Sequence, residues 1–184
     1  MEVITYEFSQ FSRPTCGWPP EEILTVPPVI RTAKPGDAPV ILAFIRELAD
    51  YERLLHEVKT NLADVEKLLF SASPKAFCDI AETADGPVGF ALWFYSVSTF
   101  EGRHGLYLED LYVRPALRGG GVGKALLGAL ARRCVDEDLA RLEWSVLDWN
   151  APAIAFYDGL GATAKTEWIT RRLTGDALTR LALT

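Results

Sequence analysis

The hydrophobic and polar positions of this chain follow two different periods, which predict a mixture of strands and helices. Short runs rich in apolar, β-branched and aromatic residues are typical of strands, and they fall at 29–31, 76–82, 88–97, 106–113, 142–147 and 162–169. Apolar residues three or four positions apart are typical of helices. We expect five helices. The first carries Ile41, Phe44, Ile45, Leu48 and Leu55, the second spans 62–70, the third begins at Val122, the fourth follows Asn150 and the fifth spans 176–183.

Turn residues indicate how these elements connect. Asp85 and Gly86 lie between two strand patterns and are typical of a hairpin, so these two strands and the next should form three consecutive antiparallel strands. Pro115 ends the third, because proline cannot donate to a sheet ladder. Asp37 and Asn150 are placed to cap the helices that follow them.

Residues 1–28 differ from the rest of the chain. They contain five prolines and show no clear period. We expect an irregular N-terminal extension over 1–28 and a single mixed α/β domain over 29–184.

The stretch 106–129 holds a candidate ligand site. Its apolar strand is followed by Arg118, by glycines at 119, 120, 121 and 123, and then by a helical period. Free N–H groups at a helix N-terminus, beside a loop without Cβ atoms, form an anion site. The Walker pattern fails because Ala125 stands where it needs serine or threonine, and the dinucleotide pattern fails because position 124 is lysine. A glycine-rich turn without a ligand is the alternative.

Composition narrows the classes of partner. The 184 residues carry a net charge of −6, which argues against nucleic acid and anionic membranes and suits a cationic small substrate. Cys16, Cys78 and Cys134 form neither a metal spacing nor a disulfide framework, which favours the cytoplasm. His56 and His104 have no partner pattern and are expected to be surface residues. No apolar run is long enough to span a membrane.

Glu109 and Asp110 interrupt the apolar strand at 106–113. A buried carboxylate is costly unless it is compensated, and strand alternation sends the two to opposite faces unless a bulge intervenes. One interpretation is a structural ion pair with an arginine. The other, which the neighbouring glycine loop favours, is a base or a cation-binding site.

A second segment, 150–162, contributes to the same hypothesis. Asn150 and Tyr157 are seven residues apart, so they lie on nearly one helical face. Taken alone, Phe156 and Tyr157 favour core packing. In order after Arg118-x-x-Gly121-x-Gly123, however, the segment resembles the GCN5-related N-acetyltransferases (the GNAT superfamily). The glycine loop resembles their coenzyme A pyrophosphate loop.

Within that superfamily the chain resembles the spermidine/spermine, or diamine, N-acetyltransferases. The resemblance covers about 29–183 and is carried by 46–52, 107–113, 118–123, 149–157 and Trp168. It implies the GNAT acyl-CoA N-acyltransferase fold, an α/β fold with a mixed, mostly antiparallel central sheet flanked by helices. It also implies acetyl transfer from acetyl-coenzyme A to a primary amine, by a homodimer without a metal.

The resemblance implies roles for particular residues. Glu109 is expected to accept the amine proton and Tyr157 to protonate the leaving thiolate. The amine pocket is expected to include Tyr51, Glu52, Glu109, Asp110 and Trp168. The residues expected to bind acetyl-coenzyme A are Leu111, Tyr112 and Val113 for pantetheine, Arg118, Gly119, Gly120, Gly121, Val122, Gly123 and Lys124 for pyrophosphate, and Asn150 and Tyr157 near the thioester.

One segment departs from the family pattern. Residues 98–102 lack the acid-then-tryptophan order expected of the mammalian polyamine enzymes, although Phe100 and Glu101 offer an aromatic ring and an acid nearby. The acceptor is therefore left open between a polyamine or diamine and a thialysine-like or lysine-like amine. A protein or peptide N-acetyltransferase and a non-catalytic acyl-CoA-binding module are the alternative functions.

Overall fold

The computed structural model describes residues 27–184, which form two compact parts, 27–144 and 145–184. The expected extension at 1–28 falls outside the described residues except for its last two positions. Its irregular structure and the domain boundary at residue 29 therefore stay predictions.

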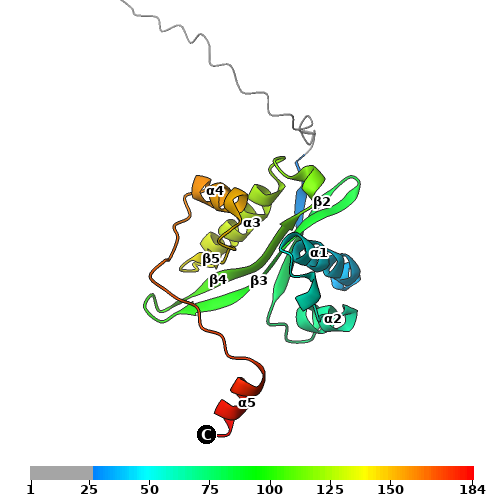
Figure 1. Cartoon of the computed structure of the whole chain (residues 1–184). Coiled ribbons are helices and arrows are strands. Elements are labelled where there is room, and N and C mark those ends of the chain that lie inside the picture. Colours follow the sequence, from blue (N-terminus) through cyan, green and yellow to red (C-terminus); the bar gives the residue numbers. More distant parts are fainter. Residues whose placement is uncertain (1–26) are drawn as a thin grey trace, which may run out of the picture. The chain divides into compact units, whose positions relative to one another are not determined.

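The first part is built on a five-stranded sheet whose strands lie in chain order (Figure 1). The first four strands pair antiparallel, and the fifth pairs parallel with the fourth. The predicted mixed, mostly antiparallel sheet is therefore confirmed. The strands are β1 (Val29–Thr32), β2 (Phe77–Thr83), β3 (Gly86–Ser98), β4 (Arg103–Val113) and β5 (Leu142–Trp144).

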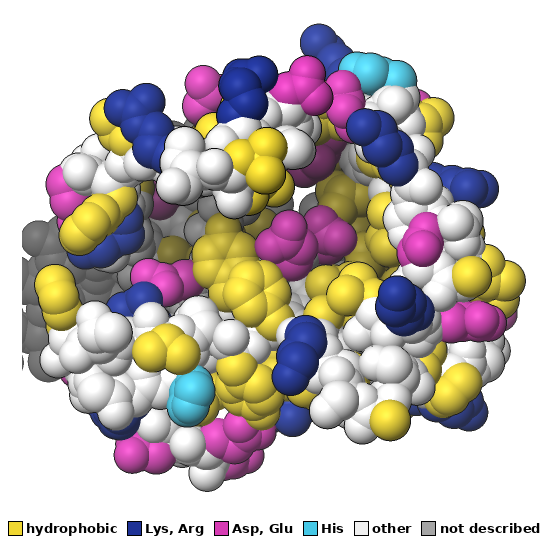
Figure 2. All heavy atoms as spheres, turned by 90° about the horizontal axis from the view of Figure 1, so that it is seen from below, with side chains coloured by type: hydrophobic (Ala, Val, Ile, Leu, Met, Phe, Trp, Pro, Cys, Tyr) yellow, Lys and Arg dark blue, Asp and Glu magenta, His cyan; other side chains and the backbone are white. Residues whose placement is uncertain are grey.

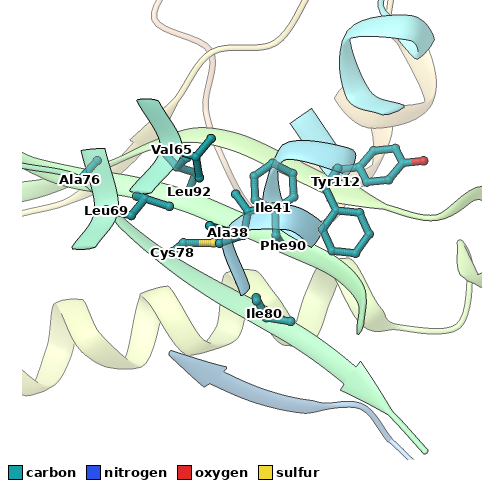
Figure 3. Packing of buried hydrophobic residues seen from close by; sticks show 11 residues of the cluster. Ala38, Ile41, Val65, Leu69, Ala76, Cys78, Ile80, Phe90, Leu92 and Tyr112 are labelled. Carbon is teal, nitrogen blue, oxygen red and sulfur yellow. The ribbon is translucent and has the colours of Figure 1, made fainter. Parts of the chain in front are cut away.

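Helices cover both faces of this sheet. α1 (Ala38–Tyr51) and α2 (Leu62–Phe70) lie on one face, and α3 (Val122–Asp136) lies on the other (Figure 1). Ile41 and Phe44 of α1 are fully buried and pack with side chains of α2, β2, β3 and β4 (Figure 3). Since burying one such side chain contributes roughly 1.5–3 kcal/mol, this cluster fixes α1 on the sheet.

A β-bulge in β4 decides which of its side chains face α1. Leu108 pairs with Trp93 and Asp110 pairs with Leu92, so Glu109 is an extra residue in the β3–β4 ladder. Partners across a ladder point to the same face. Leu108 therefore shares the face of Trp93, on which a guanidinium of α3 lies, while Asp110 shares the face of Leu92, which belongs to the α1 cluster. In a regular strand Leu108 and Asp110 would point to the same face.

Two expectations about α1 are wrong. Leu55 lies beyond the end of the helix, in a short 3₁₀ turn, and is 46% exposed. The Asp37 carboxylate does not cap α1. It accepts hydrogen bonds from the Arg31 guanidinium at 2.7 and 3.0 Å and from the Lys34 N–H at 2.8 Å. Charge-assisted bonds are the stronger ones, so the arginine takes the carboxylate away from the helix end.

The second part contains α4 (Ala151–Gly159) and α5 (Gly175–Ala182), as predicted. The strand predicted over 162–169 is wrong, because the chain is irregular from 160 to 174. A strand persists only where a neighbour completes its backbone hydrogen bonds, and 145–184 contains no other strand. None of the helices in the described chain combines the length and the apolar composition needed to cross a bilayer.

Candidate active site

The edge of β4 that faces β5 is paired over only part of its length. β5 pairs with Leu106–Leu108 and ends at Trp144. In the described sheet, Leu111, Tyr112 and Val113 pair only with β3. Backbone groups at a strand edge are a template for an extended ligand. The pantetheine amides are assigned to this stretch by the sequence, and that assignment stays a prediction.

The glycine loop after β4 leads into the N-terminus of α3. Gly119 and Gly121 have φ angles of 80° and 84°, a left-handed conformation that glycine adopts without steric cost. Gly121 directly precedes the 15-residue helix, and no side chain caps it. A Cβ atom on Gly121 would meet no heavy atom of the described chain within 4 Å. Free N–H donors, open space and the positive end of a helix dipole fit an anion such as pyrophosphate.

Three carboxylates are grouped where the β4 bulge approaches the end of α1. Burial, and then the charges of Glu109 and Glu52, raise the pKa of the partly buried Asp110 to about 6. Burial also raises the pKa of Glu52, the residue that follows α1, whereas Glu109 is exposed. Within the described chain, no ion pair joins these three to an arginine or lysine. A bound cation would stabilise the group.

One face of the molecule carries acidic, basic and hydrophobic side chains together. On the face that Figure 2 shows, acidic side chains (magenta) lie beside hydrophobic ones (yellow), and basic side chains (dark blue) are interspersed. The described residues on this face therefore form no continuous surface of a single charge sign.

Arg118 connects the glycine loop to the end of α1. Its guanidinium lies 4.5 Å from the ring centroid of Tyr51, the last residue of α1, and 5.6 Å from that of Tyr112 in β4. Its Nε donates a hydrogen bond to the backbone oxygen of Val113 at 2.9 Å. The structure therefore brings together, in the first part, the predicted residues Tyr51, Glu52, Glu109, Asp110 and Arg118.

Glu47 is a residue of this region whose role the sequence analysis missed. Burial, together with a hydrogen bond to Glu47, raises the pKa of Tyr112 to about 12. A Glu47 oxygen also lies 3.6 Å from the Arg114 side chain. The available signal was spacing, because Glu47 is one helical turn before Tyr51 and shares its face of α1.

The tip of the β3–β4 hairpin carries the two residues suggested as replacements in the amine pocket. Phe100 is 95% exposed, and Glu101 forms a 3.9 Å ion pair with Arg103. Neither is among the groups that shift the pKa of Asp110. Their part in binding an acceptor stays a prediction.

The other predicted site residues lie in the second part of the chain. Asn150 caps α4 as predicted, since its Oδ1 accepts a hydrogen bond from the Ala153 N–H at 3.3 Å. Tyr157 lies on α4 with its ring 5.4 Å from that of Phe156. Trp168 lies in the irregular segment and is 72% exposed. The roles of Asn150, Tyr157 and Trp168 at the site stay predictions.

The described residues contain no group of three or more His, Cys, Asp or Glu side chains arranged to hold a metal ion.

Comparison with known proteins yields one family and several relatives. The family model of the "Acetyltransferase (GNAT) family" matches residues 42–162. A thialysine N-epsilon-acetyltransferase of Bos taurus is 39% identical over 165 residues, which cover 84% of this chain and 96% of that protein. The L-ornithine N5-acetyltransferase NATA1 of Arabidopsis thaliana is 32% identical and covers 81% of this chain and 85% of its own.

A solved structure shows the same fold. An integron cassette protein from the mobile metagenome of V. cholerae superposes with a TM-score of 0.72 at 25% identity, over 86% of this chain and 99% of its own. The relatives matched by sequence and the superposed structure cover similar shares of this chain, from 81% to 86%.

Proposed function

Because this chain belongs to the acetyltransferase (GNAT) family, we propose that it transfers the acetyl group of acetyl-coenzyme A to a primary amine of a small cationic acceptor. The observation that carries the proposal is the group of Glu52, Glu109 and Asp110 at the end of α1, which the Arg118–Tyr51 contact joins to the glycine loop. The named activities of the bovine and Arabidopsis relatives favour a thialysine-like, ornithine-like or lysine-like acceptor. A polyamine or diamine is the second choice.

The reaction first requires a neutral amine, and the carboxylates provide a group that can accept the amine proton. A lysine-like amine has a pKa of about 10 and is mostly protonated at neutral pH, but only the neutral form attacks a thioester. We assign Glu109 to accept the proton, directly or through water, because it is exposed at the bulge. Asp110 and Glu52 hold the cation before it loses the proton.

The second requirement is a proton for the leaving group. As the nitrogen forms its bond to the acetyl carbon, the carbon–sulfur bond breaks and a thiolate leaves. We assign Tyr157 on α4 to donate this proton from its phenol, Asn150 to lie near the thioester, and Trp168 to line the amine pocket. A positioned general acid or base contributes roughly 10²–10⁴-fold to a rate.

The strand edge and the loop would hold acetyl-coenzyme A, which supplies the activated acetyl group. We assign the backbone of Leu111–Val113 to the pantetheine amides and the N–H groups over 118–124 to the pyrophosphate. The unpaired strand edge and the left-handed glycines support this assignment.

Gly121→Asp is expected to weaken acetyl-coenzyme A binding by roughly 10-fold, because a carboxylate at the helix N-terminus would repel the pyrophosphate. Gly121→Asn is the matched control, since asparagine has the same shape, tolerates a left-handed backbone and carries no charge. The Cβ itself meets open space. Calorimetry on both folded variants measures the effect, and equal affinities for Asp and Asn would contradict the placement.

A panel of amines tests the proposed function itself. Release of free thiol from acetyl-coenzyme A should be faster with thialysine, lysine and ornithine than with spermidine and short diamines, and absent with peptides that offer only an α-amine. Turnover with peptides alone would support the protein N-acetyltransferase alternative. Binding of acetyl-coenzyme A without thiol release from any amine would support the non-catalytic alternative.

We also propose that the protein is a homodimer. The second part exposes Trp168, Ile169, Leu178 and Leu181 at 72%, 74%, 53% and 61%, and a second copy would remove such apolar side chains from water. Light scattering at micromolar concentration should give close to twice the 20.4 kDa of one chain. A mass of one chain under those conditions would rule out the dimer.

A cytoplasmic location is part of the same proposal. Cys78 and Cys134 are free thiols, which suits a reducing compartment. Cell fractionation with an antibody to the protein measures the location directly, and recovery in an extracytoplasmic fraction would contradict it.

A further inference from the structure

The Arg118–Tyr51 contact joins two regions to which the proposed function gives different ligands. Arg118 begins the glycine loop, and Tyr51 ends α1 directly before Glu52. The guanidinium lies 4.5 Å from the Tyr51 ring centroid and is also held by a 2.9 Å hydrogen bond to the Val113 oxygen. A shift of the loop at Arg118 would therefore change the contact between its guanidinium and the Tyr51 ring.

The described contacts of Arg118 are with neutral groups, namely two tyrosine rings and a backbone oxygen. A cation above a ring is attracted more strongly when water is removed from the pair. Tyr51 is 37% exposed and Arg118 is exposed as well. A ligand that covers the loop would shield the guanidinium, and a ligand that covers the end of α1 would shield the ring.

We infer that the Arg118–Tyr51 stack makes acetyl-coenzyme A and the amine bind cooperatively. Each ligand desolvates one member of the stack, strengthens the contact and thereby fixes the element that binds the other ligand. Arg118 acts here as a positioning residue, through Tyr51 and the neighbouring Glu52. This inference rests on the proposed function, because it takes the loop and the carboxylates as the two binding regions.

Calorimetry with thialysine tests the inference, with free coenzyme A as the non-reacting partner. Wild-type protein should bind thialysine about 5-fold more tightly when coenzyme A is saturating, a factor within the range that one cation–π contact supplies. By linkage, saturating thialysine should tighten coenzyme A binding by the same factor. A wild-type factor of one in both directions would overturn the inference.

Variants distinguish an effect of the Arg118–Tyr51 stack from the loss of a direct contact between either residue and a ligand. Tyr51→Leu keeps apolar bulk but removes the ring face, and Arg118→Lys keeps the charge but removes the planar group. Both should reduce the factor toward one, whereas Tyr51→Phe keeps the ring and should preserve it. An unchanged factor in folded Tyr51→Leu would show that the stack transmits nothing.

A second readout keeps the inference distinct from the proposed function. Without any amine, Tyr51→Leu should weaken coenzyme A binding about 3-fold, because Arg118 and the loop lose their support, and Tyr51→Phe should not. Unaltered coenzyme A affinity in Tyr51→Leu would overturn the link even if the enzyme acetylates amines normally. A wild-type protein that acetylates no amine would refute the function instead.

Discussion

Tyr157→Phe is expected to lower kcat by roughly 100-fold while leaving the acetyl-coenzyme A dissociation constant almost unchanged. The substitution keeps the ring and its packing 5.4 Å from Phe156, and it removes only the phenolic proton donor. Without that donor the thiolate must leave unprotonated or take its proton from water, and the loss falls within the range typical of general acid catalysis. Single-turnover rates with saturating thialysine measure the chemical step directly.

Tyr95→Phe is the matched control for this experiment. The Tyr95 hydroxyl donates a 2.6 Å hydrogen bond to Glu137, the residue that directly follows α3, on the sheet face opposite α1. Loss of this hydrogen bond should lower the free energy of unfolding by about 1 kcal/mol and leave kcat unchanged. A wild-type single-turnover rate in Tyr157→Phe would show that Tyr157 is a packing residue.

Asp110→Asn is expected to make the protein more stable and a poorer enzyme. The pKa of Asp110 is raised from 3.8 to about 6, so its contribution to stability is fully present below pH 3.8 and is lost as the pH rises through 6. The two pKa values differ by about 2.2, and a pKa difference of one corresponds to about 1.36 kcal/mol. The free energy of unfolding therefore falls by at most roughly 3 kcal/mol. Asparagine does not ionise, so the variant should exceed wild type in urea unfolding at pH 8 and lose that advantage at pH 4.

The same substitution should raise KM for thialysine by at least about 10-fold, because one of the charges that hold the ammonium is gone. Glu109→Gln provides the comparison. Glu109 is exposed, so stability should change little, but the rate deficit should shrink as the pH approaches the amine pKa of about 10. Destabilisation of Asp110→Asn at both pH values, with an unchanged KM, would mark Asp110 as structural. A Glu109→Gln deficit that is constant with pH would remove the base assignment.

The features that the sequence predicted best are those decided within a few residues. The bounds of α2 agree with the prediction, and its start is fixed locally by Asn61, which accepts a hydrogen bond from the Asp64 N–H at 3.2 Å. The glycine loop and the start of α3 were predicted for the same reason, because left-handed glycines and helical period are adjacent in the chain. Membership of the GNAT family, predicted from these motifs, is confirmed.

The features that the sequence did not settle depend on partners far along the chain. The bulge at Glu109 exists only in the register between β3 and β4. The strand expected at 162–169 lacks a partner within its own part of the chain. Likewise, the position of Arg118 on Tyr51 joins residues 67 positions apart, and no local pattern encodes such a contact.

The bulge in β4 also determines whether the carboxylate group could be transferred to another protein. Copying Glu109 and Asp110 onto a regular strand of another protein would transfer the side chains without their geometry, because a shift of one residue exchanges the two faces of a strand. For the fold alone, replacement of Glu109 is tolerated better than its deletion, since removing the residue would turn Asp110 and Tyr112 toward α3 or Leu106 and Leu108 toward α1. The fold therefore constrains the length of β4 at this point, whereas the proposed chemistry constrains its composition.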